Sequence, residues 1–272
     1  MGLVPESMND AKFYGVELDS ISGRIAQQLY QKNSIAVQGF ESTNLPDSFF
    51  DAAIGNVPFG QFKVPDKRYD KHNFLIHDYF FARTMDKVRP GGIIAFITSK
   101  GTMDKENPSV RKYLAQRAEL LGAIRLPNNT FKDAAGTEVT ADILILQKRD
   151  RMVDQLPAWV NLGIDANGLA INQYFVDNPS MVLGTMQEVI GPYGPETACL
   201  LIDGSSLEEL LTDAIQNING SVMEYEVDDP ESEEEDRSIP ADPSVRNFSF
   251  TVVDGDCLLY TSPSPRDSTS SR

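Results

Sequence analysis

The sequence contains few cysteines and no long apolar run. Its 272 residues include only Cys199 and Cys257, and this argues against a disulfide scaffold or a cysteine-based metal site. No apolar stretch approaches the roughly 18 residues that a membrane-spanning helix needs, and the first residues lack the pattern of a signal peptide. His72 and His77 have no partners at metal-ligand spacing. We therefore expect a cytoplasmic protein that binds no metal and no membrane.

Basic residues are scarce in the second half of the chain. Residues 1–150 carry 19 Lys and Arg against 18 Asp and Glu, whereas residues 151–272 carry 5 against 22 and contain no lysine. The acidic residues are densest between 228 and 236, and such blocks are usually solvated and disordered. The net charge of -16 therefore belongs to the C-terminal region and does not oppose an anionic ligand on the first half.

Apolar runs and helical periodicities alternate along the first 150 residues, which is typical of an α/β fold with a mostly parallel sheet and helices on both faces. The predicted strands are 12–18, 34–40, 49–55, 93–97, 123–126 and 141–147, and the predicted helices are 19–30, 73–88 and 107–121. Beyond Arg151, prolines and glycines interrupt the pattern, apart from a helix predicted over 205–218.

These changes of pattern divide the chain into four regions. Residues 1–150 form the principal domain, and residues 151–225 are interpreted as a linker or small accessory region. Residues 226–256 form an irregular, acidic and largely disordered segment. Residues 257–272 are rich in Ser, Pro and Thr and resemble a translated sequencing adapter, so we interpret them as an artefact.

The third predicted strand ends in Asn56-Val57-Pro58-Phe59. Open α/β sheets bind their ligands at the carboxyl ends of the strands. The loop offers a side-chain amide, main-chain carbonyls beside a stiff proline, and a flat ring for stacking. These groups together suit a planar molecule that carries an amino group.

The tetrapeptide resembles the Asn-Pro-Pro-Tyr/Phe signature of S-adenosylmethionine-dependent amino-methyltransferases, and its position is similar to that in N6-adenine DNA methyltransferases. The resemblance implies a Rossmann-like mixed sheet, S-adenosylmethionine as methyl donor and DNA as substrate. It further implies that Asn56 and the carbonyl of Val57 accept hydrogen bonds from the target amine, while Phe59 stacks on a flipped base. Val57 replaces the usual proline, and we expect only a modest loss of rigidity because Pro58 still restricts the preceding residue.

The same resemblance assigns roles to residues outside the loop. Glu17 would bind the ribose hydroxyls of the cofactor, and Phe40 and Glu41 would contact its adenine. Phe131 would form the other side of the base pocket, and a basic loop after Phe59 would contact DNA phosphates. That loop contains the candidates Lys67 and Arg68. Simpler alternatives stay open: Glu17 could favour a helix dipole, Glu41 could be a solvated glutamate, Phe131 could pack on the core, and the basic loop could be ordinary surface.

A glycine-rich turn that would hold the methionine part of the cofactor is missing before Glu17. We therefore expect a sheet that lacks its first strand and glycine-rich loop. The parent would be a longer polypeptide of a mobile-element or phage type, with a helicase-like region beside the methylase, and the chain by itself would be impaired. An RNA or protein-glutamine methyltransferase, or a non-catalytic DNA-recognition domain, remains an alternative.

Overall fold

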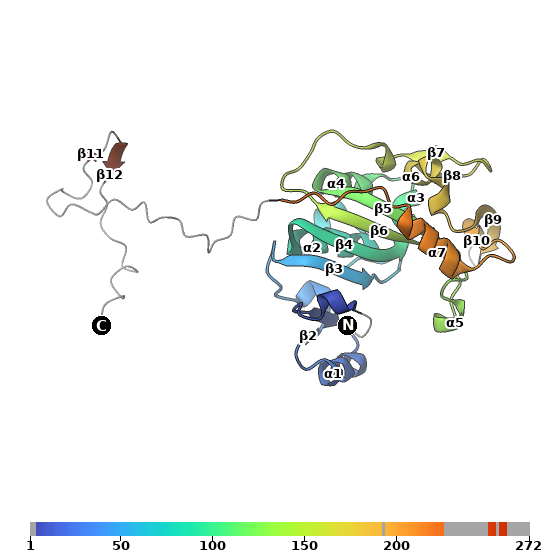
Figure 1. Cartoon of the computed structure of the whole chain (residues 1–272), viewed down its shortest axis with the longest axis horizontal. Coiled ribbons are helices and arrows are strands. Elements are labelled where there is room, and N and C mark those ends of the chain that lie inside the picture. Colours follow the sequence, from blue (N-terminus) through green and yellow to red (C-terminus); the bar gives the residue numbers. More distant parts are fainter. Residues whose placement is uncertain (1–3, 192–193, 226–249, 254–255, 260–272) are drawn as a thin grey trace. The chain divides into compact units, whose positions relative to one another are not determined.

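The computed structural model describes residues 4–191 and 194–225, together with the backbone of 250–253 and 256–259 (Figure 1). The chain divides into two units, Met1–Tyr225 and Glu226–Arg272. In the second unit, β11 (Phe250–Val253) pairs antiparallel with β12 (Asp256–Leu259). The acidic block 228–236 and most of the adapter-like segment 257–272 lie outside the described residues.

A four-stranded mixed sheet forms the centre of the first unit. Its strands are arranged in the order β3 (Phe50–Asn56), β4 (Val88–Ser99), β6 (Ala141–Lys148) and β5 (Ala118–Leu126). Only β3 and β4 are parallel, and β6 is antiparallel to both of its neighbours. The mixed sheet is confirmed, but the expectation of a mostly parallel sheet is wrong. The connection from β5 to β6 contains only the one-turn helix α5 (Lys132–Ala135), whereas parallel strands usually need a full crossover helix.

A separate two-stranded sheet precedes the central one. It pairs β1 (Tyr14–Glu17) with β2 (Ser34–Val37) in parallel, after the short helix η1 (Glu6–Met8). The crossover helix α1 (Ser20–Leu29) begins as predicted, because Asp19 accepts a hydrogen bond from the Ser22 N–H at 2.7 Å.

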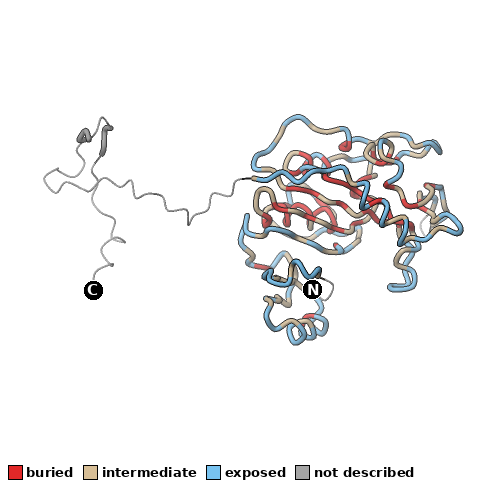
Figure 2. The backbone as a smooth tube through the Cα atoms, viewed as in Figure 1, coloured by how far each residue is buried: buried red, intermediate tan, exposed pale blue. Residues whose placement is uncertain are grey.

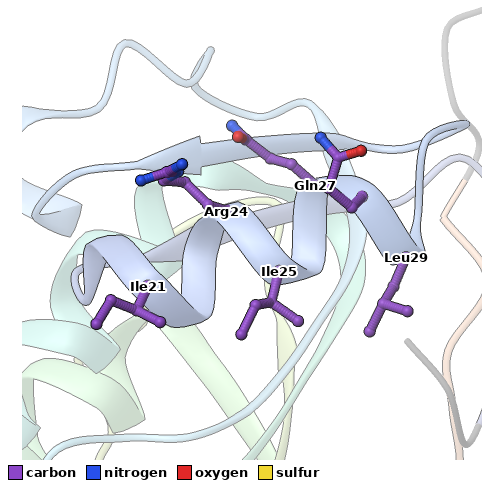
Figure 3. Close-up of a pocket in the computed structure, with 6 residues that line it drawn as sticks. Ile21, Arg24, Ile25, Gln27 and Leu29 are labelled. Carbon is purple, nitrogen blue, oxygen red and sulfur yellow. The ribbon is translucent and has the colours of Figure 1, made fainter.

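Helix α1 packs closely against strand β2 with one face and leaves the opposite face exposed. A Cβ on Gly23 would lie 2.8 Å from a methyl group of Val37, so only glycine allows this approach. The opposite side carries Ile21, Ile25 and Leu29 in a row along the helix, which Figure 3 shows, and all three are exposed. The apolar stripe that the sequence pattern places on one face therefore does not face the small sheet.

The hydrophobic core lies between the central sheet and the helices α2 (Ile76–Lys87) and α4 (Ser109–Arg117), as Figure 2 shows by burial. Phe81 of α2 and Ile94 of β4 are completely buried there. Helix α4 ends at Arg117 and not near residue 121 as predicted, because Ala118 already pairs with Lys148 of β6. Residues 118–121 therefore start strand β5.

The region from residue 152 to residue 225 is folded where the structure describes it. Its elements are η4 (Ala158–Val160), β7 (Leu162–Ile164), β8 (Ala170–Asn172), α6 (Gln173–Asp177), η5 (Pro179–Met181), β9 (Thr185–Gly191), β10 (Gly194–Leu200) and α7 (Leu207–Gln216). Two buried polar side chains attach it to the core. Arg111 donates to the carbonyl of Val160 at 2.7 Å, and Asn172 donates to the carbonyl of Met103 in α3 (Gly101–Asp104) at 2.9 Å.

Residues 218–225, which we call the strap, run back over the central sheet after α7. The side-chain amide of Gln147 donates to the Met223 carbonyl at 2.7 Å and accepts from the Met223 N–H at 2.9 Å. The same amide donates to the carbonyl of Gly91 at 2.9 Å. One side chain of β6 thus pairs with the strap as a neighbouring strand would.

Candidate functional site

The loop that begins at Asn56 lies at the carboxyl edge of the central sheet. Asn56 is the last residue of β3 and lies opposite Ile97 of β4. The next residue continues this pairing, because the Val57 N–H donates to the Ile97 carbonyl at 3.0 Å. Asn56 and Pro58 are exposed, Phe59 is half-buried, and Val57 is only 4% exposed. The valine side chain therefore anchors the loop in the core.

A cleft of about 680 Å³ separates β1 from β3. Glu17 and Leu18 line it from the end of β1, and Asn56 and Pro58 line it from the end of β3. Phe40, in the short helix η2 (Phe40–Ser42), lines it as well. The structure therefore brings Glu17, Phe40 and Asn56 to one cavity, although Glu17 and Asn56 are 39 residues apart in the sequence. Phe59 lies outside the lining of this cavity.

Glu17 and Phe40 are held in place by neighbours. One carboxylate oxygen of Glu17 accepts a hydrogen bond from the Asp19 N–H at 2.9 Å. The ring of Phe40 lies 5.1 Å from that of Phe80 and 5.2 Å from the guanidinium carbon of Arg83. Both side chains are thus fixed by groups of their own chain, which favours a preformed site.

Glu41 and Phe131 lie outside the lining of this cleft. Glu41 is exposed and accepts a hydrogen bond from the Ser42 hydroxyl at 3.2 Å. Phe131 caps the start of α5, and its half-buried ring packs against the hydrophobic core. The loop before it is attached to the accessory region, because the Asn128 N–H donates to the Cys199 carbonyl at 2.8 Å.

Lys67 and Arg68 lie on the exposed loop between Phe59 and α2. Arg68 forms ion pairs with Asp47 at 2.8 Å and with Asp86 at 3.0 Å. These pairs raise the pKa of Arg68, the hydrogen bond with Asp47 being the largest cause. The positive charge of Arg68 is therefore balanced by carboxylates of its own chain. The same loop is tied to α2 by the Tyr69 hydroxyl, which donates to Asp86.

Two features of the first unit do not emerge from the sequence pattern, one in the cleft and one in the core. Helical periodicity places Phe80 in the helix core with its neighbours, yet it lines the cleft beside Phe40. Helical geometry could have found it, because successive residues on a helix point about 100° apart and only part of the run can face the core. The second feature is the ion pair of Arg125 with Asp142, both fully buried, and no local pattern in the sequence indicates it.

Two other kinds of site are absent from the described residues. No described helix is long and apolar enough to cross a membrane. Within the part of the chain that the structure describes, no three His, Cys, Asp or Glu side chains gather to form a metal site.

Comparison with known proteins identifies the class. A family model described as N-6 DNA Methylase matches residues 6–166. The Defense against restriction protein B of Escherichia phage P1 is 36% identical over 148 residues, which are 52% of this chain and 6% of that protein. The chain therefore spans a small fraction of the length of this curated relative.

Two solved structures also align with part of the chain. A putative class I S-adenosylmethionine-dependent methyltransferase from Listeria monocytogenes aligns with a TM-score of 0.43 and 24% identity, over 54% of this chain and 46% of that one. A modification subunit of a putative type I restriction enzyme from Vibrio vulnificus YJ016 aligns with a TM-score of 0.42 and 18% identity, over 72% and 49%.

The match of the N-6 DNA methylase model to residues 6–166 places the chain in the methyltransferase class. It belongs to the N-6 DNA methylase family, whose model covers more than half of its length. Membership implies S-adenosylmethionine as the cofactor. The residues of the cleft fit this molecule, because a carboxylate can accept from ribose hydroxyls and an aromatic ring can flank adenine. The cavity volume of about 680 Å³ lies within the range of roughly 300–1,000 Å³ that small-molecule sites occupy.

Proposed function

We propose that the parent protein transfers a methyl group from S-adenosylmethionine to the N6 amino group of adenine in DNA. The observation that supports this proposal is the position of Asn56: its exposed side chain ends β3 and lines the same cleft as Glu17 and Phe40. An amine-binding group at the mouth of a cavity that suits the cofactor is the arrangement that methyl transfer to an amine requires.

The chemistry follows from the properties of an exocyclic amine. Its lone pair is delocalised into the adenine ring, so the nitrogen is a poor nucleophile. In our proposal the Asn56 side-chain oxygen and the Val57 carbonyl accept hydrogen bonds from the two N–H groups and favour a more tetrahedral nitrogen, whose lone pair can attack. The bound cofactor would supply an electrophilic methyl group on its sulfonium: the new carbon–nitrogen bond replaces the carbon–sulfur bond, whose electron pair stays on sulfur, and the amine releases one proton to water. Glu17 and Phe40 would hold it by its ribose and adenine.

The target base must leave the duplex to reach this loop. Unstacking a base costs roughly a few kcal/mol, and stacking on an aromatic ring can offset part of that cost. We assign this stacking to Phe59, with Phe131 on the other side of the base. Lys67 and Arg68 would contact phosphates, although Arg68 would have to exchange an ion pair with Asp47 to do so. A helicase-like domain elsewhere in a longer polypeptide would supply access to the DNA.

The cofactor should bind weakly to this chain alone. Of the described residues that line the cleft, only Gly55 is a glycine, so no glycine-rich turn there lets the main chain approach the methionine part of the ligand. Isothermal titration with S-adenosylmethionine measures this affinity. Micromolar binding would contradict the inference.

The decisive test is transfer of a labelled methyl group by the parent protein at saturating cofactor. We expect label in DNA, recovered as N6-methyladenine, and a loss of about 100-fold or more for Asn56→Ala, the magnitude that removal of one preorganised hydrogen-bonding group produces. Asn161→Ala, at an exposed asparagine outside the cleft, is the matched control and should retain activity. Label in RNA or in protein glutamine would refute the substrate, and full turnover by Asn56→Ala would refute the site.

A further inference from the structure

Helix α2 carries a row of polar side chains that contact two loops. Tyr79, Arg83 and Asp86 recur at intervals of four and three residues, which places them on one face of the helix. One of the two loops contains η2 and runs over residues 40–47, which we call the η2 loop. The other is the basic loop, residues 60–75. The row therefore touches both a loop that we assign to the cofactor and a loop that we assign to DNA.

Arg83 contacts both loops at once. Its Nη1 donates to Oδ2 of Asp66 in the basic loop at 2.8 Å, and its Nη2 donates to the Thr43 carbonyl of the η2 loop at 2.9 Å. Its guanidinium carbon also lies 5.2 Å from the ring centre of Phe40. Because a guanidinium is planar and rigid, its nitrogen atoms keep fixed positions relative to one another. A displacement of the η2 loop is therefore transmitted to Asp66.

Thr43 connects Arg83 to the main chain of Phe40. The N–H and the hydroxyl of Thr43 donate to the Phe40 carbonyl at 3.2 and 2.7 Å, and the carbonyl of Thr43 accepts from Arg83. The ring of Phe40 lines the cleft. A ligand that packs against this ring would therefore restrain Arg83 as well.

Asp66 determines the conformation of the basic loop. Its Oδ1 accepts from the Arg68 N–H at 3.0 Å, and its carbonyl accepts from the Asp70 N–H at 2.9 Å. Its Oδ2 accepts from Arg83 and from the Tyr79 hydroxyl, each at 2.8 Å. The position of the Asp66 carboxylate therefore fixes the main chain at Arg68, which we assign to a phosphate.

The two contacts of Arg83 stabilise each other. Its side chain is buried, and its Nε has no hydrogen-bond partner among the described residues. Losing the contact to either loop would leave a further buried donor unpaired, which is costly. The ion pair of Arg68 with Asp47 also joins the two loops, but its side chains are 53% and 46% exposed and such pairs contribute little. Arg83 is therefore the stronger link.

We propose that Arg83 is a positioning residue that couples the binding of adenine at Phe40 to the order of the basic loop. In the free chain, Phe40 and Thr43 are restrained by contacts within the protein. A bound adenine would add a contact to the Phe40 ring and so stabilise the hydrogen bond from Arg83 to Asp66. The cofactor would thereby order the basic loop before DNA binds. The inference rests on the proposed function, which assigns adenine to Phe40.

The test uses adenosine, which contains the adenine and ribose of the cofactor and lacks the methionine part that a glycine-rich turn would hold. Amide hydrogen exchange of the chain is followed by NMR with and without millimolar adenosine, and a chemical-shift change at Phe40 reports binding. We expect the amides of Arg68 and Asp70 to exchange about fivefold more slowly with adenosine, near the lower end of ordinary couplings.

Two variants distinguish coupling from stability. Arg83→Lys keeps the positive charge but replaces the planar fork with a single nitrogen, so the fivefold effect should be lost. Tyr79→Phe is the matched control: it removes the other donor to the same Asp66 oxygen and leaves the fork in place, so the effect should remain. If Arg83 served stability alone, Arg83→Lys would speed exchange equally with and without adenosine.

The possible failures have different meanings. A shift at Phe40 with unchanged exchange at Arg68 and Asp70 would overturn the inference and leave the proposed function standing. A fivefold effect that survives Arg83→Lys, or that Tyr79→Phe abolishes as well, would overturn the role of the fork. If adenosine shifts no signal at Phe40, the adenine site is wrongly assigned, and the proposed function then loses its cofactor site too.

Discussion

Replacing Asp142 with asparagine should destabilise the first unit strongly. Arg125 and Asp142 are both completely buried, and they meet through two hydrogen bonds of 2.8 and 2.9 Å. Asp104 contacts the same guanidinium at 2.7 Å, and the ring of Phe175 lies 4.3 Å from its central carbon. The asparagine would keep the shape of the aspartate side chain but would remove one negative charge from beside a cation that has no access to water.

The size of the effect follows from this geometry. Breaking a buried ion pair by removing one partner costs about 3–5 kcal/mol. Because Asp104 still pairs with Arg125, we expect a value near the lower end, about 3 kcal/mol. Domains are stable by only about 5–15 kcal/mol in total, so this would be a large fraction of the whole.

Urea unfolding of the wild-type and Asp142→Asn chains measures the difference. With a slope of about 2 kcal/mol per molar urea, the midpoint should fall by about 1.5 M. The matched control is Glu138→Gln, which breaks the ion pair with Lys132 on the surface, where the side chains are 49% and 62% exposed; its midpoint should not move. A shift of Asp142→Asn no larger than that of Glu138→Gln would refute the reasoning.

Three further perturbations test other parts of the first unit. Burial lowers the pKa of His77 below its ordinary value of 6.5, so the unfolded chain binds the proton more tightly than the folded chain. The free energy of unfolding should therefore fall as the pH drops below 6.5, and urea unfolding of His77→Gln should show a smaller fall over the same pH range. Burial raises the pKa of Cys199 to about 12, so its thiol should resist iodoacetamide in the native chain and react after unfolding. Mass spectrometry measures the alkylation, and equal rates of alkylation of Cys199 in the native and unfolded chains would contradict this. Gly220→Ala would place a Cβ in steric overlap with the Leu121 carbonyl oxygen and should lower the free energy of unfolding by about 1–3 kcal/mol, measured as a lower Tm. An unchanged Tm would contradict this, because it would mean that the strap shifts to accommodate the added methyl group.

Local patterns predict the elements near the cleft well. Asp19 is a typical N-cap residue, and α1 begins directly after it. The apolar run that ends at Asn56 forms a strand, and its polar loop lies at the carboxyl edge. These features depend on a few neighbouring residues, so the sequence contains the information needed to predict them.

The boundary between α4 and β5 could not be read in the same way. Residues 118–121 are Ala-Glu-Leu-Leu, which are good helix formers, and propensity alone continues the helix. In the structure Ala118 pairs with Lys148 and Leu120 with Leu146, so contacts with β6 override the local preference. Propensity differences of a few tenths of a kcal/mol per residue are small beside the burial of a strand.

Contacts distant in the sequence account for the remaining differences. The basic loop suggests that Arg68 is available for phosphates, yet Asp47, which lies 21 residues earlier, pairs with it. Arg125 and Asp142 are 17 residues apart and meet only because β5 and β6 are adjacent. No spacing rule reveals such pairs, because the sheet order that creates them is itself a property of the whole fold.

The strap has a practical consequence for binding measurements. Tyr225 ends it beside Gly91, near the start of β4, where a Cβ on that glycine would lie 2.8 Å from the tyrosine ring. Ile97, which pairs with Asn56, is six residues further along the same strand, or about 20 Å at 3.3 Å per residue. A dye or a biosensor tether attached at Tyr225 would therefore sit at the far end of the sheet and leave the Asn56 loop accessible to ligands.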